Sequence, residues 1–428
     1  MTTCDMLSKS DPVIPMPGSK SITHRAVIAA SLARGTSVLH RFLECEDTEY
    51  TINALRRLGV RIHKEKNRLI VEGRAGSPCE RRVQEDIYLG NSGTSFRLLL
   101  SVTALCRGAF LLTGAERMCQ RPIGPLVSAL NQLGVQAACV NQDGRPPVRI
   151  HAKGIQGGKA FVSRDQSSQF LSSLLLTAPC AERDVEISVT GRRVSGPYVD
   201  MTLHVMDRFG IRVDQNDDRE FRVRGGREYK AREFTVQGDA SSASYFWAAA
   251  AVTGRTVATT NIQPREAWQG DLKFPDILEE MGCSVQKGPD RVTVRGGGLK
   301  GIEADMGDLP DMVPTLAAVA LFARGKTVIR NAAHLRHKES DRLHALTVEW
   351  RRLGGRIQEL ADGLVIEGEA PLHGVVVDPH NDHRLAMSLA VAGLRIPGLT
   401  IRDRDCVGKS FPGFWELWET LLRRWGRC

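Results

Sequence analysis

The chain has 428 residues and a formal net charge of +9, with 58 lysines and arginines against 49 aspartates and glutamates. At 42% hydrophobic and 25% charged residues, it is long and apolar enough to bury the cores of two or three domains. The basic balance permits an anionic partner, whether nucleic acid, a membrane surface or small acidic substrates, and charge alone does not choose among them.

The cysteines and the N-terminal stretch argue against several protein classes. Ten cysteines are scattered from Cys4 to Cys428 without a CxxC pair, which argues against a zinc ribbon or a thioredoxin-like motif and favours reduced thiols. The stretch MTTCDMLSKSDP lacks the apolar core of a signal peptide. The longest apolar runs, such as Tyr245 to Val252, are too short to span a bilayer. We therefore expect a cytoplasmic soluble protein.

The first predicted element is a helix that begins in the stretch PGSKSITHRA, residues 17–26. Ser19 is a suitable cap, and an apolar run follows it. Lys20, His24 and Arg25 lie in the first turns, where the helix dipole disfavours a cation by a few tenths to about 1 kcal/mol. Basic residues at this end of a helix make sense if an anion binds there.

Further along the chain, an amphipathic helix that ends in an apolar residue and glycine occurs six times, at spacings of 72 to 76 residues. The final glycines are Gly59, Gly134, Gly210, Gly282, Gly354 and Gly426. Glycine suits a helix end because it accepts left-handed dihedrals. The first five copies are followed by two alternating runs around a polar turn, and each repeat also has a second, more apolar helix. One repeat is therefore predicted as strand, helix, strand, helix and hairpin.

Six such α/β units pack better as two groups of three, each around its own core, than as a solenoid. The sixth copy stops at Gly426 without a hairpin, and the strand-like stretch PVIPMP near the N-terminus could fill that gap. We therefore predict a first domain over residues 20–235, and a second domain formed by residues 1–19 together with residues 236–428.

The polar starts of the more apolar helices repeat the basic pattern of the first one. These starts are GSKSITHR, GNSGTSFR, DQSSQF, GDASSAS, LPDMVP and HNDHR. Cations in or near these and other helix starts are Arg97, Arg121, Lys338, Arg342, Arg384 and Lys409. A simple cap, or an arginine that reaches solvent, is the more common explanation for any single site. The repetition across several helix starts is what indicates bound anions.

Other motifs do not fit the sequence. Residues 408–410, GKS, resemble the end of a P-loop, but position 403 is aspartate where that motif requires glycine. His380, Asp382 and His383 lack the spacing of a zinc site. There is no GxSxG elbow and no basic patch interleaved with aromatic residues.

Two carboxylates are candidates for acid–base chemistry. Asp311 directly precedes an apolar helix, and Glu339 lies between Lys338 and Arg342 in HKESDR. A carboxylate among cations should stay ionised, although burial opposes this, and it can exchange a proton with a substrate held against it. A helix cap at Asp311 and a surface ion pair between Glu339 and Arg342 explain the same pattern equally well.

At these residues the chain resembles the EPSP synthase family of enolpyruvyl transferases almost from end to end. The matching stretches are PGSKSITHRA, LGNSGTSFR, RPIGPL, SSQFLSSLLLTAP, SGPY, GDASSASYF, KESDRL, NDHRLAM and GKSFP. The resemblance implies an α/β fold of two domains, each with three βαβαββ repeats in pseudo-threefold symmetry, and an active site in the interdomain cleft. It implies transfer of the enolpyruvyl group of phosphoenolpyruvate to the 5-hydroxyl of shikimate 3-phosphate, with release of phosphate and without a metal or organic cofactor.

The resemblance also implies roles for individual residues. The residues that would hold shikimate 3-phosphate are Lys20, Ser21, Arg25, Ser167, Ser168, Gln169, Ser195, Tyr198, Asp311, His334 and Lys338. The residues that would hold phosphoenolpyruvate are Lys20, Asn91, Gly93, Arg97, Arg121, Gln169, Arg342, Arg384 and Lys409. In catalysis, Asp311 would accept the hydroxyl proton and Glu339 would protonate the methylene carbon, with Lys20 between the two substrates.

Some positions depart from the pattern of the family. His334 stands where many members have asparagine, and Gly196 stands where many have a longer basic residue. The neighbours of Gly93 are changed but Gly93 is kept; a side chain there would intrude on the phosphoenolpyruvate site, and sensitivity to the inhibitor glyphosate stays open. His24 receives no catalytic role and is expected to be structural.

Two other functions are weighed against this one. The related enolpyruvyl transferase that acts on UDP-N-acetylglucosamine shares the fold, but it has Lys-Asn where this chain has Lys20-Ser21, and a loop cysteine where this chain has Glu116. A basic nucleic-acid-binding repeat protein would explain the net charge, but not Asp311 and Glu339 among the cations. The favoured function requires small-molecule substrates only, no nucleic acid or membrane partner, and a monomer.

Overall fold

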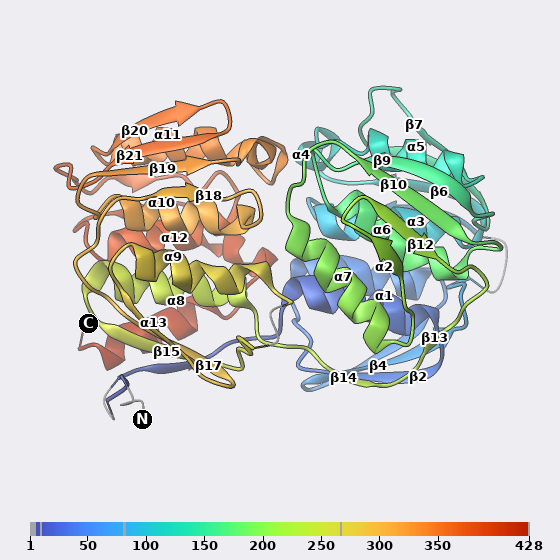
Figure 1. Ribbon diagram of the computed structural model, residues 1–428, viewed down its shortest axis with the longest axis horizontal. Coiled ribbons are helices and arrows are strands. Elements are labelled where there is room, and N and C mark those ends of the chain that lie inside the picture. Colours follow the sequence, from blue (N-terminus) through green and yellow to red (C-terminus); the bar gives the residue numbers. More distant parts are fainter. Residues whose placement is uncertain (1–5, 9–10, 80–82, 266–267, 427–428) are drawn as a thin grey trace. The chain divides into compact units, whose positions relative to one another are not determined.

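The computed structural model describes residues 6–8, 11–79, 83–265 and 268–426. The chain divides into two compact units. One, here the 20–236 unit, is Lys20–Val236; the other, here the 237–428 unit, is Gln237–Cys428 together with Met1–Ser19. In Figure 1 the colours run from blue to yellow-green over the first and on to red over the second. Among the described residues, no helix has both the length and the apolar character that a membrane crossing needs.

The 20–236 unit consists of three similar repeats. The first contains α1 (Lys20–Leu32), β2 (Ala33–His40), α2 (Glu46–Arg57), β3 (Arg61–Glu65) and β4 (Arg68–Arg74). The second contains β5 (Val83–Tyr88), α3 (Gly93–Ala104), β6 (Arg107–Thr113), α4 (Glu116–Cys119), α5 (Gly124–Gln132), β7 (Gln136–Cys139) and β8 (Val148–Lys153). The third contains β9 (Gly158–Ser163), α6 (Gln169–Thr177), η1 (Ala178–Cys180), β10 (Val185–Thr190), α7 (Gly196–Arg208), β11 (Asp214–Asn216) and β12 (Glu220–Val223), before β13 (Tyr229–Lys230) and β14 (Glu233–Thr235).

The 237–428 unit follows the same plan. It begins with β1 (Val13–Pro15) and continues with α8 (Ala240–Thr253), β15 (Thr256–Thr260), η2 (Gly270–Lys273), α9 (Phe274–Glu280), β16 (Ser284–Lys287) and β17 (Arg291–Arg295). The next repeat has β18 (Glu303–Asp305), η3 (Pro310–Met312), α10 (Val313–Ala320), β19 (Lys326–Arg330), η4 (Ala333–His337), α11 (Arg342–Arg352), β20 (Arg356–Leu360) and β21 (Gly363–Glu367). The last has β22 (Val376–Val377), α12 (His383–Gly393), β23 (Thr400–Ile401), η5 (Arg404–Lys409) and α13 (Phe414–Arg424).

The sheets confirm the predicted α/β repeat. In five of the sheets among the described residues, a central strand pairs in parallel on one side and with a hairpin on the other. For β6, the parallel neighbour is β5 and the hairpin is β8–β7. The same order recurs around β10 and β19. In the last repeat, the sheet is reduced to the parallel pair of β22 and β23.

The core of each unit is formed by three helices that are buried on nearly every side. In the 20–236 unit these are α1, α3 and α6, which contact one another. In the 237–428 unit they are α8, α10 and α12, which lie side by side in Figure 1. A helix without a polar face must be covered on all sides, so sheets and amphipathic helices surround it. The polar residues at the starts of these buried helices are therefore unusual compared with the rest of each helix.

The six glycines that end the amphipathic helices behave as predicted. All of them have positive φ, between 65° at Gly426 and 112° at Gly282. This left-handed conformation is readily accessible to glycine and ends a helix.

The sequence led us to expect that the stretch PVIPMP completes the sixth repeat. It does not. Instead, β1 pairs in parallel with β15, at the edge of the fourth repeat's sheet. The matching edge in the first repeat is taken by β14, which pairs in parallel with β2. The central strand of each of these repeats has a parallel strand beside it. The strand β1 precedes α1 along the chain but pairs in the 237–428 unit, whereas β14 precedes α8 but pairs in the 20–236 unit.

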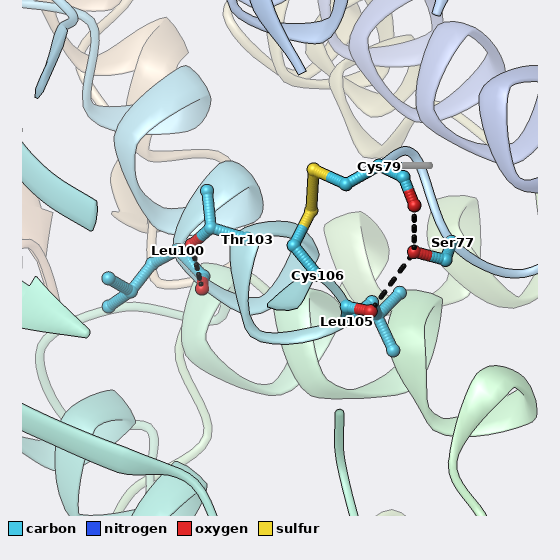
Figure 2. Close-up of a disulfide and its surroundings, with 6 residues drawn as sticks. All are labelled: Ser77, Cys79, Leu100, Thr103, Leu105 and Cys106. Atoms are coloured by element: carbon cyan, nitrogen blue, oxygen red, sulfur yellow. Dashed lines mark hydrogen bonds between the residues drawn. A yellow bond between two sulfur atoms is a disulfide. The ribbon is translucent and has the colours of Figure 1, made fainter. Parts of the chain in front are cut away.

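A disulfide between Cys79 and Cys106 corrects the expectation that all thiols are reduced. The two Cα atoms are 5.3 Å apart, a usual separation for a bridge. Figure 2 shows the bridge beside Ser77, whose hydroxyl donates to the carbonyl oxygen of Leu105 at 3.1 Å. The bridge joins the segment after β4 to the end of α3. The sequence could not show this pairing, because the two cysteines are 27 residues apart.

Candidate active site

The basic residues at the start of α1 have different partners. Lys20 Nζ lies 2.9 Å from Asp47 Oδ2, and the Asp47 carboxylate is buried. His24 is also buried, and its Nδ1 lies 2.8 Å from Thr51 Oγ1. The charge of Lys20 is therefore balanced within the 20–236 unit, while the ring of His24 connects α1 to α2.

Arg25 is a buried cation, with 1% of its surface exposed. Its guanidinium donates to the hydroxyls of Thr202 at 2.7 Å and Ser172 at 3.4 Å. It also donates to the carbonyl oxygens of Ser21 at 2.9 Å and Tyr198 at 3.1 Å. Burial lowers the pKa of Arg25 to about 10, against an opposing effect of Tyr198. Because these acceptors are neutral, a bound anion would lower the cost of the buried charge.

A second group of cations surrounds the start of α3. Arg97 Nη1 donates to Gln169 Oε1 at 2.8 Å, which connects α3 to α6. Arg121 Nη1 donates to the carbonyl oxygen of Asn91 at 3.2 Å. Gly93 leaves room for this guanidinium, since a Cβ atom at position 93 would lie 2.6 to 2.8 Å from it. The structure therefore brings together five of the residues expected to hold phosphoenolpyruvate.

The expected hydroxyl residues lie at the starts of α6 and α7. Ser168 is the N-cap of α6, and Ser167 Oγ accepts from the backbone N–H of Gln169 at 3.2 Å. Ser195 is the N-cap of α7 and has the left-handed conformation, with φ 54° and ψ 40°. Its side chain forms no cap hydrogen bond. These helix starts therefore each carry serine hydroxyl groups.

In the 237–428 unit, Arg342 at the start of α11 binds three carboxylates. Its Nη1 lies 3.0 Å from Asp311 Oδ1, its Nη2 lies 2.9 Å from Glu339 Oε2, and its Nε lies 2.8 Å from Asp382 Oδ2. Burial opposes the charge of Arg342, but the carboxylates outweigh burial and raise its pKa further. Burial likewise opposes ionisation of Asp382, and Arg342 outweighs it, so the pKa of Asp382 is lowered.

These contacts bear on the structural explanations of the two candidate carboxylates. The N-cap of α10 is Met312, and the Asp311 carboxylate accepts a hydrogen bond from Arg342. The pair of Glu339 with Arg342 is buried, not a surface pair, with side-chain exposures of 9% and 1%. The candidate base and the candidate acid are thus held by one guanidinium.

Arg384, at the start of α12, is the second cation on Asp311. Its Nη2 lies 2.6 Å from Asp311 Oδ2, and its Nη1 lies 3.4 Å from the hydroxyl of Tyr245. Burial raises the pKa of Tyr245 to about 12, with Arg384 opposing the shift, so the phenol stays neutral. Asp382 caps α12 by accepting from the backbone N–H of Arg384 at 3.0 Å.

A buried carboxylate fixes the turn that precedes α12. Glu349 on α11 accepts from the backbone N–H of Asp378 at 3.0 Å, and its other oxygen lies 3.1 Å from His380 Nε2. Arg352 Nη1 lies 2.9 Å from the same carboxylate. His380 and Asn381 both have positive φ, at 53° and 52°. Residues other than glycine rarely adopt this conformation, so the surrounding contacts must hold the turn.

The remaining expected residues lie near this group. His334 is buried in η4, and its Nε2 has no hydrogen-bond partner in the part of the chain that the structure describes. Burial lowers its pKa to about 3, with Lys338 and Arg342 adding to the effect, so His334 is neutral at pH 7. Lys338 directly follows η4. Lys409 is buried in η5, which packs against α12.

Sequence reasoning missed several polar residues at these sites. They are Asp47, Asp271, Asp382 and Tyr245. Asp382 was considered only as a metal ligand, although its place before α12 could have identified the cap. Its ion pair with Arg342 spans 40 residues, which no local pattern reveals. Within the described ranges, no three His, Cys, Asp or Glu side chains are grouped so that they could hold a metal ion.

The two groups can therefore do different chemistry. The 20–236 unit offers buried cations, hydroxyls and helix N-termini, which suit phosphate or carboxylate groups. The 237–428 unit offers two carboxylates beside two arginines, which suit proton transfer to and from a charged substrate.

Comparison with known proteins identifies the family. Residues 8–418 match the family described as EPSP synthase (3-phosphoshikimate 1-carboxyvinyltransferase). A curated relative named 3-phosphoshikimate 1-carboxyvinyltransferase, from Methanoculleus marisnigri, is 48% identical over 95% of this chain and 96% of its own. One of the same name from Syntrophobacter fumaroxidans is 46% identical over 98% and 99%. A solved structure of EPSP synthase from Acinetobacter baumannii has a TM-score of 0.79 at 29% identity, covering 96% of this chain and 95% of that one. The chain belongs to the EPSP synthase family.

Proposed function

We propose that the chain transfers the enolpyruvyl group of phosphoenolpyruvate to the 5-hydroxyl of shikimate 3-phosphate, giving 5-enolpyruvylshikimate 3-phosphate and phosphate. The family match over residues 8–418 supports this reaction, because the name of the family describes it. The relatives reported above carry the same name and do not favour UDP-N-acetylglucosamine as the acceptor.

In the proposed mechanism, the two carboxylates on Arg342 have complementary roles. Glu339 donates a proton to the methylene carbon of phosphoenolpyruvate, which makes C2 electrophilic. Asp311 accepts the proton of the 5-hydroxyl as its oxygen adds to C2 and forms a tetrahedral intermediate. The ionised Glu339 then takes a proton back from the methyl group, and phosphate departs with the proton held by Asp311, which restores the double bond. The steps balance without a metal or an organic cofactor.

The proposed binding roles follow the chemistry of the two groups. Shikimate 3-phosphate is held by Lys20, Ser21, Arg25, Ser167, Ser168, Gln169, Ser195, Tyr198, Asp311, His334 and Lys338. Phosphoenolpyruvate is held by Lys20, Asn91, Gly93, Arg97, Arg121, Gln169, Arg342, Arg384 and Lys409. The buried guanidinium of Arg25, with neutral acceptors at each of its described hydrogen bonds, is the observation that most favours an anionic substrate.

The decisive experiment is a phosphate-release assay with the purified protein. We expect release only when phosphoenolpyruvate and shikimate 3-phosphate are both present. Release with UDP-N-acetylglucosamine in place of shikimate 3-phosphate would contradict the proposal. The proposal also includes a cytoplasmic location and a monomeric state. Sedimentation at working concentration tests the monomeric state.

Variants test the proposed roles in catalysis. Asp311→Asn keeps the shape of the side chain but removes the base, so turnover should fall by a factor of about 100 or more. Binding of shikimate 3-phosphate, measured by calorimetry, should stay close to wild type. Asp290→Asn, an exposed aspartate of the same unit, is the matched control. Near-normal turnover of Asp311→Asn would remove Asp311 from the catalytic role.

A further inference from the structure

A network of buried side chains joins α1 and α2 to the start of α3. Its members are His24 on α1, Thr51 on α2, and Ser92 and Ser95 at the start of α3, and none of them is more than 1% exposed. His24 Nδ1 lies 2.8 Å from Thr51 Oγ1, which donates to Ser95 Oγ at 2.9 Å. Ser92 Oγ lies 2.7 Å from Ser95 Oγ. A buried hydrogen-bond network of this kind holds the helices that it joins in one arrangement.

The direction of each hydrogen bond follows from the number of hydroxyl protons. Ser95 has one, and it donates this proton to the backbone carbonyl oxygen of Asp47 at 2.9 Å. The hydroxyls of Thr51 and Ser92 therefore both donate to Ser95 Oγ. Because the single proton of Thr51 is used in this way, His24 donates to Thr51 from Nδ1. The network thus converges on Ser95 and ends at the carbonyl oxygen of Asp47.

Ser95 matches one turn of α2. The carbonyl oxygen of Asp47 and the side chain of Thr51, four residues later, lie on the same face of that helix. The hydroxyl of Ser95 donates to the carbonyl oxygen and accepts from the threonine. Since α2 begins at Glu46, Asp47 lies in its first turn. The first turn of a helix is only partly held by bonds within the helix, so a bond from a neighbouring helix helps to fix it.

The side chain of Asp47 in turn holds the ammonium group of Lys20. Asp47 Oδ2 lies 2.9 Å from Lys20 Nζ, and the side-chain exposures are 2% for Asp47 and 12% for Lys20. The proposed function places Lys20 between the two substrates. The position of its charge therefore depends on where the backbone of Asp47 lies, and Ser95 binds that backbone.

We propose that Ser95 is a positioning residue: by fixing the backbone of Asp47, it sets the position of the Lys20 ammonium group between the two substrates. This inference rests on the proposed function, and it gives a role to a fully buried hydroxyl group that acts through its neighbour. The simpler alternative is that the network only stabilises the fold. The two explanations differ in what removal of the hydroxyl does to the kinetic constants.

The first test compares Ser95→Ala with Ser101→Ala. Ser101 is the matched control, because it is a buried serine of the same helix whose described hydrogen bond goes to Ser173 on α6, at 2.6 Å, rather than to α2. Both variants should lower the thermal midpoint by a similar amount, since each loses one buried hydrogen bond. Only Ser95→Ala should lower kcat/KM for phosphoenolpyruvate, by roughly tenfold, because it displaces a catalytic group. An unchanged kcat/KM in Ser95→Ala, or an equal fall in both variants, overturns the inference.

The second test asks whether the effect of Ser95 passes through Lys20. Calorimetry measures the affinity for shikimate 3-phosphate in wild type, Ser95→Ala, Lys20→Met and the double variant. Ser95→Ala should weaken binding severalfold in the wild-type background. It should change nothing in the Lys20→Met background, where there is no ammonium group to displace. The same loss of affinity in both backgrounds contradicts the assignment.

The proposed function and this inference fail in different ways. If wild type itself releases no phosphate with both substrates, the proposed function fails. If wild type is active and Ser95→Ala keeps its kcat/KM, only this inference fails.

Discussion

Asp271 is the buried carboxyl group that we expect to control how the stability of the 237–428 unit depends on pH. It lies in η2, where the hydroxyl of Ser241 at the start of α8 donates to its Oδ2. Burial is the main cause that raises the pKa of Asp271 to about 7. The charges of Asp311 and Asp239 act in the same direction, whereas Ser241 and Arg384 oppose them.

The sign of the effect follows from the two pKa values. The folded value of about 7 lies above the ordinary value of 3.8, so the folded state holds this proton more tightly than the unfolded state. Stability therefore decreases as the pH rises from 3.8 to 7, and stays at the lower level above pH 7. At about 1.36 kcal/mol for each pKa unit, the whole difference is about 4 kcal/mol. About 3 kcal/mol of it falls between pH 5 and pH 8.

Asp271→Asn keeps the shape of the side chain and removes the ionisation. Relative to wild type, the variant should gain about 3 kcal/mol of unfolding free energy between pH 5 and pH 8, or roughly 6 to 12 °C in the thermal midpoint. Circular dichroism at both pH values measures this. Asp276→Asn on α9, which removes an exposed pair with Lys287, is the control and should show no such pH dependence. A difference from wild type that is equal at pH 5 and pH 8 would refute the reasoning.

Three further predictions concern local contacts. Gly93→Ala brings a methyl group against the Arg121 guanidinium, so the KM for phosphoenolpyruvate should rise severalfold in the phosphate-release assay. Replacing Cys79 and Cys106 with serine should lower the unfolding free energy by about 3 to 4 kcal/mol, as the 27-residue separation implies, and the variant's urea midpoint should no longer respond to reductant. Glu349→Gln loses acceptors for the turn before α12, so the thermal midpoint and kcat should both fall; an unchanged kcat would contradict the positioning role.

The sequence predicted the repeated features of this fold because their signals are local. A helix that ends in an apolar residue and glycine needs only about ten consecutive residues to be recognised, and the glycines all have positive φ. The alternating hairpins are equally local. By contrast, the edge strand β1 could not be placed, because its three residues fit any parallel edge and the choice depends on which sheet lacks one. The bridge between Cys79 and Cys106 was missed because its two cysteines are 27 residues apart, and no local pattern pairs them.

The charge partners within the candidate site likewise could not be predicted from the sequence. The sequence placed cations in or near helix starts, but it could not show how many acids each cation serves. Arg25 donates to neutral acceptors alone in its described hydrogen bonds, whereas Arg342 binds three carboxylates. Glu339 lies only three residues before Arg342, but Asp311 and Asp382 come from distant stretches, so only the folded chain brings them to it.

This difference matters for how an anionic substrate could use the two arginines. The described hydrogen bonds of Arg25 all go to neutral acceptors, so an anion beside it lowers the free-energy cost of its burial. Arg342 is surrounded by three negative charges, so a further anion gains little from it unless a carboxylate takes up a proton or leaves. Glu339 is one of those three and is the proposed proton donor. An anion arriving at Arg342 would raise the proton affinity of that carboxylate through like-charge repulsion, which is the direction that an acid catalyst requires.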